Sequence, residues 1–301
     1  MDEALDNYSS LHRLLSGAID YAGLFPPAGL DLATALANYR AYRGSADAWA
    51  LGRFVVPAAQ LNELEGLLRD GNVTVAERLP LTVLLGTAGA DEVRAIEHFN
   101  ARSGEHGGRV ESVEVKAASD NAARAVLAVL PVEWNRYLEI SLDSASEAVL
   151  EALAAGRAFA KIRTGGVTPD AFPEVDQLVH FLQAAARRRL AFKATAGLHH
   201  PLRGCYRLSY AEAAPQGVMY GFLNLFLAAT LAWGGAAAVQ LRAALREDDP
   251  AALRLDPAAL QWRELRIGAT ALAQLRENFC HSFGSCSFRE PLDELAAGGW
   301  T

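Results

Sequence analysis

Short apolar runs alternate with amphipathic stretches of helical period along most of this chain, and this alternation constrains its fold more than any other feature. One run and the stretch that follows it together span about 30 residues. Strands that alternate with helices predict βαβ units and a parallel sheet, because two parallel strands need a crossover connection. Eight such runs in a chain of 301 residues predict an α/β fold, the closed (β/α)8 TIM barrel.

The boundaries follow from the same pattern. Strands are expected at residues 17–23, 49–57, 79–86, 109–117, 136–143, 159–165, 190–197 and 279–288. Helices are expected at residues 32–42, 60–69, 91–101, 121–129, 146–155 and 174–189. A doubly wound open sheet is the alternative, but LFPPAG after the first run is not the Gly-rich phosphate turn that such folds normally carry. We therefore expect one barrel domain over residues 1–301.

One interval of the chain is longer than the barrel pattern requires. Residues 201–277, between the seventh and eighth runs, predict a helical insertion on the active-site side that forms a cap or an oligomer contact. It should contain an apolar helix at 219–237, a hairpin of 253–256 with 261–265, and a helix at 269–278. The apolar helix is compatible with a homodimer.

Composition excludes several classes of protein. The net charge of −7, without any basic run, argues against nucleic-acid binding. The acidic start lacks the features of a signal peptide, and the apolar run at 222–238 contains Asn224, which favours a buried helix over a membrane span. The cysteines are too few and odd in number for a disulfide framework. These features predict a cytoplasmic protein whose partner is a small molecule. The cysteines are Cys205, Cys280 and Cys286.

Alternation of side chains along the strands predicts a charged barrel interior. Leu138 and Ile140 are expected to face the helices, which turns Glu139 inward, and the other strands divide in the same way. The expected inward charges are Asp20, Glu114, Lys116, Glu139, Asp143, Lys161, Arg163 and Lys193. Charges in a barrel interior are costly unless they are paired or used, so the ring marks an active site at the strand ends. An ion-pair network that merely fills the barrel is the alternative.

The positions of the lysines are the strongest indication of catalytic chemistry in this sequence. The chain has 28 Lys plus Arg residues, and the only lysines are Lys116, Lys161 and Lys193, all at expected inward positions. Arginine stays protonated and cannot act as a nucleophilic amine, whereas a lysine with a lowered pKa can. The pattern favours chemistry that needs an amine, with the carboxylates Glu114, Glu139 and Asp143 as proton shuttles for an imine or enamine.

Three motifs carry a resemblance to the class I deoxyribose-phosphate aldolases. Lys161 opens KIRTGG, Lys193 opens KATAGLHHP, and the eighth run reads FGSCSF. The resemblance implies that Lys161 forms the Schiff base, that Lys193 lowers its pKa, and that Glu114 is the carboxylate of the fourth strand. It also implies a phosphate site, at Gly197, Gly284, Ser285 and Ser287. Along its whole length the chain resembles a bacterial barrel family marked by IDYAGLFPPA, KIRTGG, FKATAGLHHP and FGSCSF, which implies no activity.

The expected function is a lyase that acts on a small anionic or phosphorylated carbonyl compound through a lysine imine, without a cofactor. Substrate contacts are expected from Asp20, Lys116, Arg163, Thr195, His199, Gly284, Ser285 and Ser287. The loop IDYAGLFPPAG should sit at the barrel mouth, with Tyr21 and Phe25 lining it. One alternative is a metal-dependent lyase or hydrolase that uses His199, Glu139 or Asp143 and a cysteine. Another is a non-catalytic barrel that binds an anion.

Overall fold

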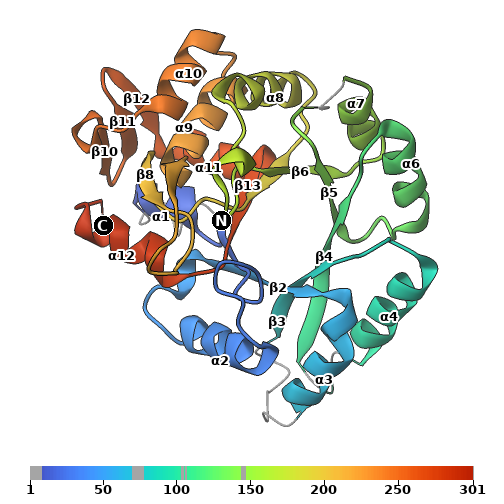
Figure 1. The fold of residues 1–301 in the computed structure, drawn as a ribbon. Helices are drawn as coiled ribbons and strands as arrows, with labels where there is room; N and C mark the ends of the chain where they lie inside the picture. The colour runs from blue at the N-terminus through green and yellow to red at the C-terminus, as the bar shows by residue number, and fades with distance from the viewer. Residues whose placement is uncertain (1–8, 70–77, 103–104, 106, 144–146, 301) are drawn as a thin grey trace.

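Eight parallel strands close into a barrel with helices around it (Figure 1). The computed structural model describes residues 9–69, 78–102, 105, 107–143 and 147–300. Around the barrel the strand order is β1-β13-β7-β6-β5-β4-β3-β2. The strands are β1 (Ile19–Tyr21), β2 (Leu51–Pro57), β3 (Leu79–Leu84), β4 (Gly108–Lys116), β5 (Asn135–Ile140), β6 (Phe159–Arg163), β7 (Phe192–Thr195) and β13 (Cys280–Ser285). The predicted TIM barrel is confirmed, and each predicted run overlaps one of these strands, although β4 and β5 each begin one residue before the predicted boundary.

Helices follow the first six strands where the amphipathic stretches predicted them. They are α2 (Leu32–Arg43), α3 (Leu61–Arg69), α4 (Ala90–Ala101), α6 (Asp120–Val129), α7 (Glu147–Ala155) and α8 (Val175–Arg187). Local sequence explains where they begin: Asp31 accepts from the Thr34 amide at 2.8 Å, and Ser119 accepts from the Ala122 amide at 3.1 Å. These side chains replace hydrogen bonds that the first turn of a helix lacks.

The first and last strands of the barrel close it. In β1, Ile19 pairs with Phe283 of β13, and Asp20 pairs with Gly284. On its other side β1 pairs with β2, where the register shifts between Ile19 and Tyr21. Because β1 and β13 come from opposite ends of the described chain, any site at their junction is assembled by the closure itself.

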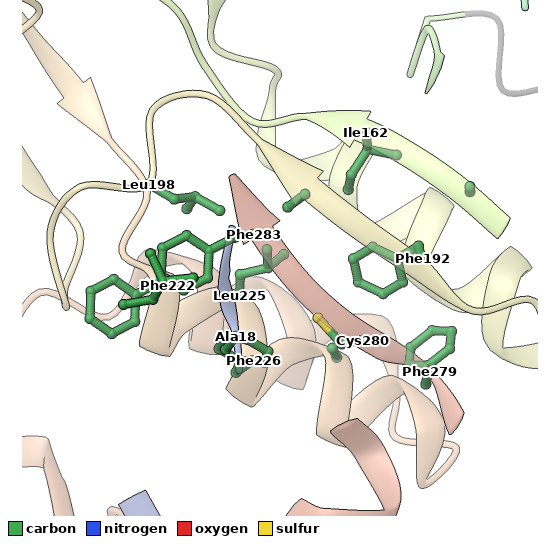
Figure 2. Packing of buried hydrophobic residues seen from close by; sticks show 14 of the residues in the cluster. Ala18, Ile162, Phe192, Leu198, Phe222, Leu225, Phe226, Phe279, Cys280 and Phe283 are labelled. Atoms are coloured by element: carbon green, nitrogen blue, oxygen red, sulfur yellow. The ribbon is translucent and has the colours of Figure 1, made fainter. Parts of the chain in front are cut away.

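The apolar helix of the long interval is a barrel helix, which corrects the prediction of a cap. It spans α9 (Phe222–Trp233) and packs against β13, where Phe222 stacks on Phe283 with ring centroids 5.2 Å apart (Figure 2). Phe226 meets the same ring, and α8, α10 (Ala238–Arg246) and α11 (Ala269–Asn278) pack around α9. A helix enclosed in this way is apolar on all sides. The apolar surface that suggested a homodimer is therefore buried within the chain.

The rest of this interval forms two small sheets. The predicted hairpin is instead a three-stranded antiparallel sheet, because a third strand pairs with its second strand. Its strands are β10 (Leu253–Asp256), β11 (Ala259–Trp262) and β12 (Leu265–Gly268). It contacts α1 (Ser10–Leu15), which also packs on α11. The other sheet is a hairpin of β8 (Gly204–Arg207) with β9 (Gln216–Met219), and α12 (Arg289–Ala297) follows β13.

None of the helices in the described part of the chain combines the length and the apolar character needed to cross a membrane.

Candidate functional site

A cavity of about 350 Å³ opens at the C-terminal ends of the strands. Parallel barrels hold their active sites at this end, because the loops that follow the strands converge there. Phe25, Pro26 and Pro27 of the loop after β1 line the cavity, as predicted for Phe25. Tyr21, predicted beside it, lies instead in the core, with its ring 5.9 Å from that of Phe54. The charged and polar lining residues are Glu114, Lys116, Glu139, Lys161, Arg163, Lys193, Thr195, His199 and Cys286.

Glu114 lies between the two buried lysines of the cavity. Its Oε2 is 2.6 Å from Lys161 Nζ, and its Oε1 is 2.6 Å from Lys193 Nζ. Burial alone would raise the pKa of Glu114, but attraction to the two ammonium groups outweighs burial and lowers this pKa to about 2. Glu114 is thus a carboxylate at neutral pH and holds two amines at fixed positions on adjacent strands.

The amine of Lys193 has three close neighbours. Its amine donates to Asp20 and to Glu114, and it lies 5.4 Å from the centre of the Tyr137 ring. Burial disfavours its charge, but Asp20 and Glu114 outweigh burial and raise the pKa of Lys193 above its ordinary value. An ammonium group has three N–H donors, and these three neighbours occupy the space around it. Lys193 is therefore held in place by two carboxylates and an aromatic ring.

Lys161 has a freer amine. It forms ion pairs with Glu114 and with Glu139, whose Oε2 lies 2.9 Å away. Among the described residues, no third partner of this amine accompanies these two, and the side chain lines the cavity. Lys161 is therefore the better placed of the two lysines for contact with a bound molecule.

Asp20 is held rigidly beneath the lysines. Its Oδ1 accepts from the Arg53 amide at 2.8 Å, while its Oδ2 accepts from Lys193 and from Ser282 Oγ, the latter at 2.9 Å. Gly52 provides the space, because a Cβ at this position would collide with Asp20 Oδ1. Asp20, which was predicted to contact substrate, is not among the residues that line the cavity, and its Oδ2 contacts Lys193.

The motif KIRTGG ties β6 to the end of β7. Thr164 donates from its hydroxyl to the Ala196 carbonyl at 2.7 Å, and its amide donates to the Thr195 carbonyl at 2.9 Å. Ala196 and Gly197 both have positive φ, at 64° and 73°, which turns the chain sharply after β7. A Cβ at Gly197 would lie 3.0 Å from Gly165 Cα, so the two loops meet backbone to backbone. This contact fixes the relative position of the two lysine-bearing strands.

Two cations at the mouth have no carboxylate partner among the described residues. Lys116 and Arg163 are both exposed, and both line the cavity. They also line an adjoining outer groove of about 380 Å³, together with Glu139. Asp143, predicted as a catalytic carboxylate, lies in this outer groove and accepts a hydrogen bond from Gln177. It is therefore separate from the lysine cluster.

The end of β13 differs from the predicted phosphate loop. Gly284 and Cys286 line the cavity, whereas Ser285 and Ser287 do not. Ser285 is buried and accepts from the Ser287 amide at 3.3 Å, and Ser287 Oγ accepts from the Glu290 amide at 3.1 Å. Successive residues of an extended strand face opposite sides, so a glycine and a cysteine at alternate positions turn inward and the serines turn away.

The two histidines of KATAGLHHP pair separately with glutamates of α12. His199 Nδ1 lies 3.0 Å from Glu290 Oε2, and His200 Nδ1 lies 2.7 Å from Glu294 Oε1. Among these four residues, His199 alone lines the cavity. His200 stacks on Tyr206, with ring centroids 3.4 Å apart.

Three of these side chains are close enough together to hold a metal ion, the one such group among the described residues. Ligand atoms of His200, Glu290 and Glu294 lie within 4.8 Å of one another. A cation there would compete with the hydrogen bonds that both glutamates already accept from the histidines. The metal set first considered, His199 with Glu139 or Asp143, is not brought together.

Sequence reasoning missed three contacts of this site. Tyr137 lies two positions before Glu139 on β5, so side-chain alternation turns both residues inward. This signal could have identified Tyr137. Ser282 lies in a strand whose register against β7 shifts between Cys280 and Phe283, so simple alternation does not place it. Glu290 comes 91 positions after His199, and no local pattern links the two residues.

A scan of protein-family models and searches of curated proteins and of solved structures return no match to this chain. The resemblance to class I deoxyribose-phosphate aldolases therefore stays a prediction.

Proposed function

We propose that this barrel is a lyase of the class I aldolase type, in which Lys161 forms an imine with a small anionic carbonyl compound. The observation that carries the proposal is the shared carboxylate of Glu114, which holds two lysine amines close to each other in different surroundings. Lys193 contacts two carboxylates and the Tyr137 ring, whereas the partners of the Lys161 amine among the described residues are two carboxylates alone. One amine for bonding and one fixed charge beside it suit imine chemistry.

The amine must lose a proton before it can attack a carbonyl carbon. Glu139, 2.9 Å from Lys161 Nζ, is suited to accept this proton, because Glu114 is held as a carboxylate by two cations. Transfer from Lys161 to Glu139 leaves the charge of the cluster unchanged. The amine then bonds to the carbonyl carbon, and the carbonyl oxygen leaves as water after taking up two protons, one from Glu139 and the other from the nitrogen. The iminium restores a positive charge at the position of the original ammonium.

The iminium is the electron sink for cleavage or formation of a carbon–carbon bond. When the bond between the α and β carbons breaks, its electron pair moves toward the iminium nitrogen and gives an enamine. Lys193 supports this step by keeping Glu114 charged and close to the nitrogen. Lys116 and Arg163, which lack carboxylate partners among the described residues, favour a substrate with a carboxylate or phosphate group.

Imine trapping with borohydride tests the proposal. The protein is incubated with acetaldehyde, pyruvate, glyceraldehyde 3-phosphate or dihydroxyacetone phosphate, reduced, and digested for mass spectrometry. Since the chain has only three lysines, a reduced adduct on a lysine side chain can be assigned without ambiguity. We expect the adduct on Lys161, its loss in Lys161→Arg, and its retention in Lys116→Arg, which keeps a cation at the mouth.

Two results would contradict this function. An adduct found only on Lys193 would reverse the assignment of the two amines. A folded protein that gives no adduct with any compound of the panel would support the alternative in which the lysines and carboxylates only fill the barrel.

A further inference from the structure

The cavity has a second reactive group that the imine chemistry above does not use. His199 lines the same cavity as Lys161 and is buried, with 8% of its surface exposed. It leaves β7 through the turn at Ala196 and Gly197, which Thr164 holds. Its position is therefore fixed by the same contact that fixes the lysine strands.

A carboxylate orients this imidazole. His199 Nδ1 is 3.0 Å from Glu290 Oε2, and Tyr210 donates to the same oxygen at 3.0 Å. Burial alone would raise the pKa of Glu290, but the bonds from His199 and Tyr210 outweigh burial and lower this pKa. The contact between Nδ1 and this carboxylate orients the ring, and Nε2 is the ring nitrogen that this contact does not use. No bond joins Nε2 to another of the described residues.

The neighbouring groups do not compete for this role. Cys286 also lines the cavity, but burial raises the pKa of its thiol, and Tyr210 lies 3.5 Å from its Sγ. His200 has its own carboxylate, Glu294, and lies outside the cavity lining. His199 therefore lies at the cavity, whereas its neighbour His200 lies outside the cavity lining and contacts Glu294 of α12.

We propose that His199, oriented by Glu290, is the acid–base group that moves the proton of the carbon–carbon step; this rests on the imine function proposed above. Nε2 removes a proton from the carbon next to the iminium, and the C–H electron pair forms the enamine. The enamine carbon attacks the carbonyl carbon of a second aldehyde. The new alkoxide then takes the proton that His199 holds. In the cleavage direction the same transfers run in reverse, so atoms and charge balance without another reactant.

This assignment gives related roles to two segments, HHP at residues 199–201 and FREP at residues 288–291. HHP supplies the imidazole, and FREP supplies Glu290 at the first turn of α12. Ser287 holds the Glu290 amide, so the end of β13 positions the carboxylate through the backbone. A base on a rigid loop suits proton transfer, because the transfer requires close and constant geometry.

The test separates imine formation from proton transfer. The probe is the simplest compound of the panel, acetaldehyde or pyruvate, that gives the Lys161 adduct. Exchange of its α-hydrogens in deuterium oxide is followed by proton NMR, and the adduct is quantified after borohydride reduction. In His199→Gln we expect exchange to fall about 100-fold while the adduct stays within about twofold of the parent. Glu290→Gln should slow exchange about 10-fold, because the ring loses its orienting charge.

His200→Gln is the matched control, because it removes the neighbouring imidazole from the same loop and should leave exchange unchanged. Exchange at the parent rate in His199→Gln, with the adduct intact, would overturn this inference alone. Absence of the adduct in the parent protein would instead overturn the imine function and this inference with it. Bound metal whose removal by chelator abolishes exchange would also overturn it, since Glu290 would then act as a ligand beside His200 and Glu294.

Discussion

Glu139 Oε2 lies 2.9 Å from Lys161 Nζ, and Lys161 is the one cation in the described part of the chain with which Glu139 forms an ion pair. This exclusive pairing distinguishes Glu139 from Glu114, whose charge is shared between two lysines. If Glu139 takes the proton of Lys161, Glu139→Gln should slow imine formation about 100-fold. The rate is measured by stopping the reaction with borohydride at successive times. Asp143→Asn, outside the lysine cluster, should stay within about twofold of the parent; an equal loss in both variants would contradict the role of Glu139.

The cations at the mouth predict a preference for charged substrates. Arg163→Gln should raise the half-saturating concentration of pyruvate in the trapping assay about 10-fold, since one charge-assisted contact is lost. The same variant should leave acetaldehyde unchanged, because that compound has no carboxylate. Arg124→Gln removes an exposed cation of α6 and serves as the control. An equal effect of Arg163→Gln on both compounds would mean that Arg163 supports the fold of the site and not the anion.

The close approach of Asp20 to Gly52 predicts a stability effect. Gly52→Ala should lower the free energy of unfolding by about 1–3 kcal/mol, because the new methyl group must displace the buried carboxylate or the strand. Urea denaturation monitored by circular dichroism measures the change. Gly66→Ala in α3 is the control, since nothing lies within 4 Å of its Cβ position, and it should stabilise the protein by about 0.5–1 kcal/mol. A tolerated Gly52→Ala would show that Asp20 is free to move.

His281 predicts a pH dependence of stability. Burial and then Arg276 lower the pKa of His281 to about 4, against about 6.5 in an unfolded chain. Between these values the unfolded chain binds a proton that the folded protein does not, so stability falls as the pH falls from 6.5 to 4. Protonation of this group alone lowers the free energy of unfolding by about 3 kcal/mol over that range. His281→Gln should flatten that part of the stability curve measured by urea denaturation.

The control for this prediction is His98→Gln, which removes an exposed histidine from α4. It should leave the slope between pH 6.5 and 4 unchanged. If His281→Gln and the parent have the same slope, His281 is protonated in the folded protein at acidic pH, and its bond to Tyr137 Oη, 2.8 Å long, must rearrange.

The interior of the barrel was predictable because side-chain alternation is a local property. Glu114, Lys161 and Lys193 lie on regular strands, and the residues on either side of each are apolar. Side-chain alternation alone therefore predicts that these three side chains face inward. The roles of the two lysines were not predictable from parity. They depend on which carboxylates surround each amine, and Asp20 reaches Lys193 from a strand 173 positions earlier.

The long interval misled the sequence prediction for a different reason. A helix enclosed by a barrel and three other helices has the same apolar composition as a helix that caps a site or joins two subunits. The packing of Phe222 and Phe226 depends on their contacts with Phe283 of β13, which is distant in sequence. The serines of FGSCSF do not line the cavity, because a motif shows which residues are near the site and not which face of the strand each one occupies.

Closure of the barrel by β1 and β13 also dictates an order of events during synthesis. Asp20 leaves the ribosome 173 residues ahead of Lys193 and 262 residues ahead of Ser282, yet in the finished protein all three share one buried contact. Burial of an aspartate that lacks both partners would cost free energy, because no ion pair or hydrogen bond would replace its hydration. These two contacts of Asp20 can therefore form only after nearly all of the barrel has been translated. The buried contact that joins Asp20, Lys193 and Ser282 is consequently completed only when β13, the last strand of the barrel, has been made.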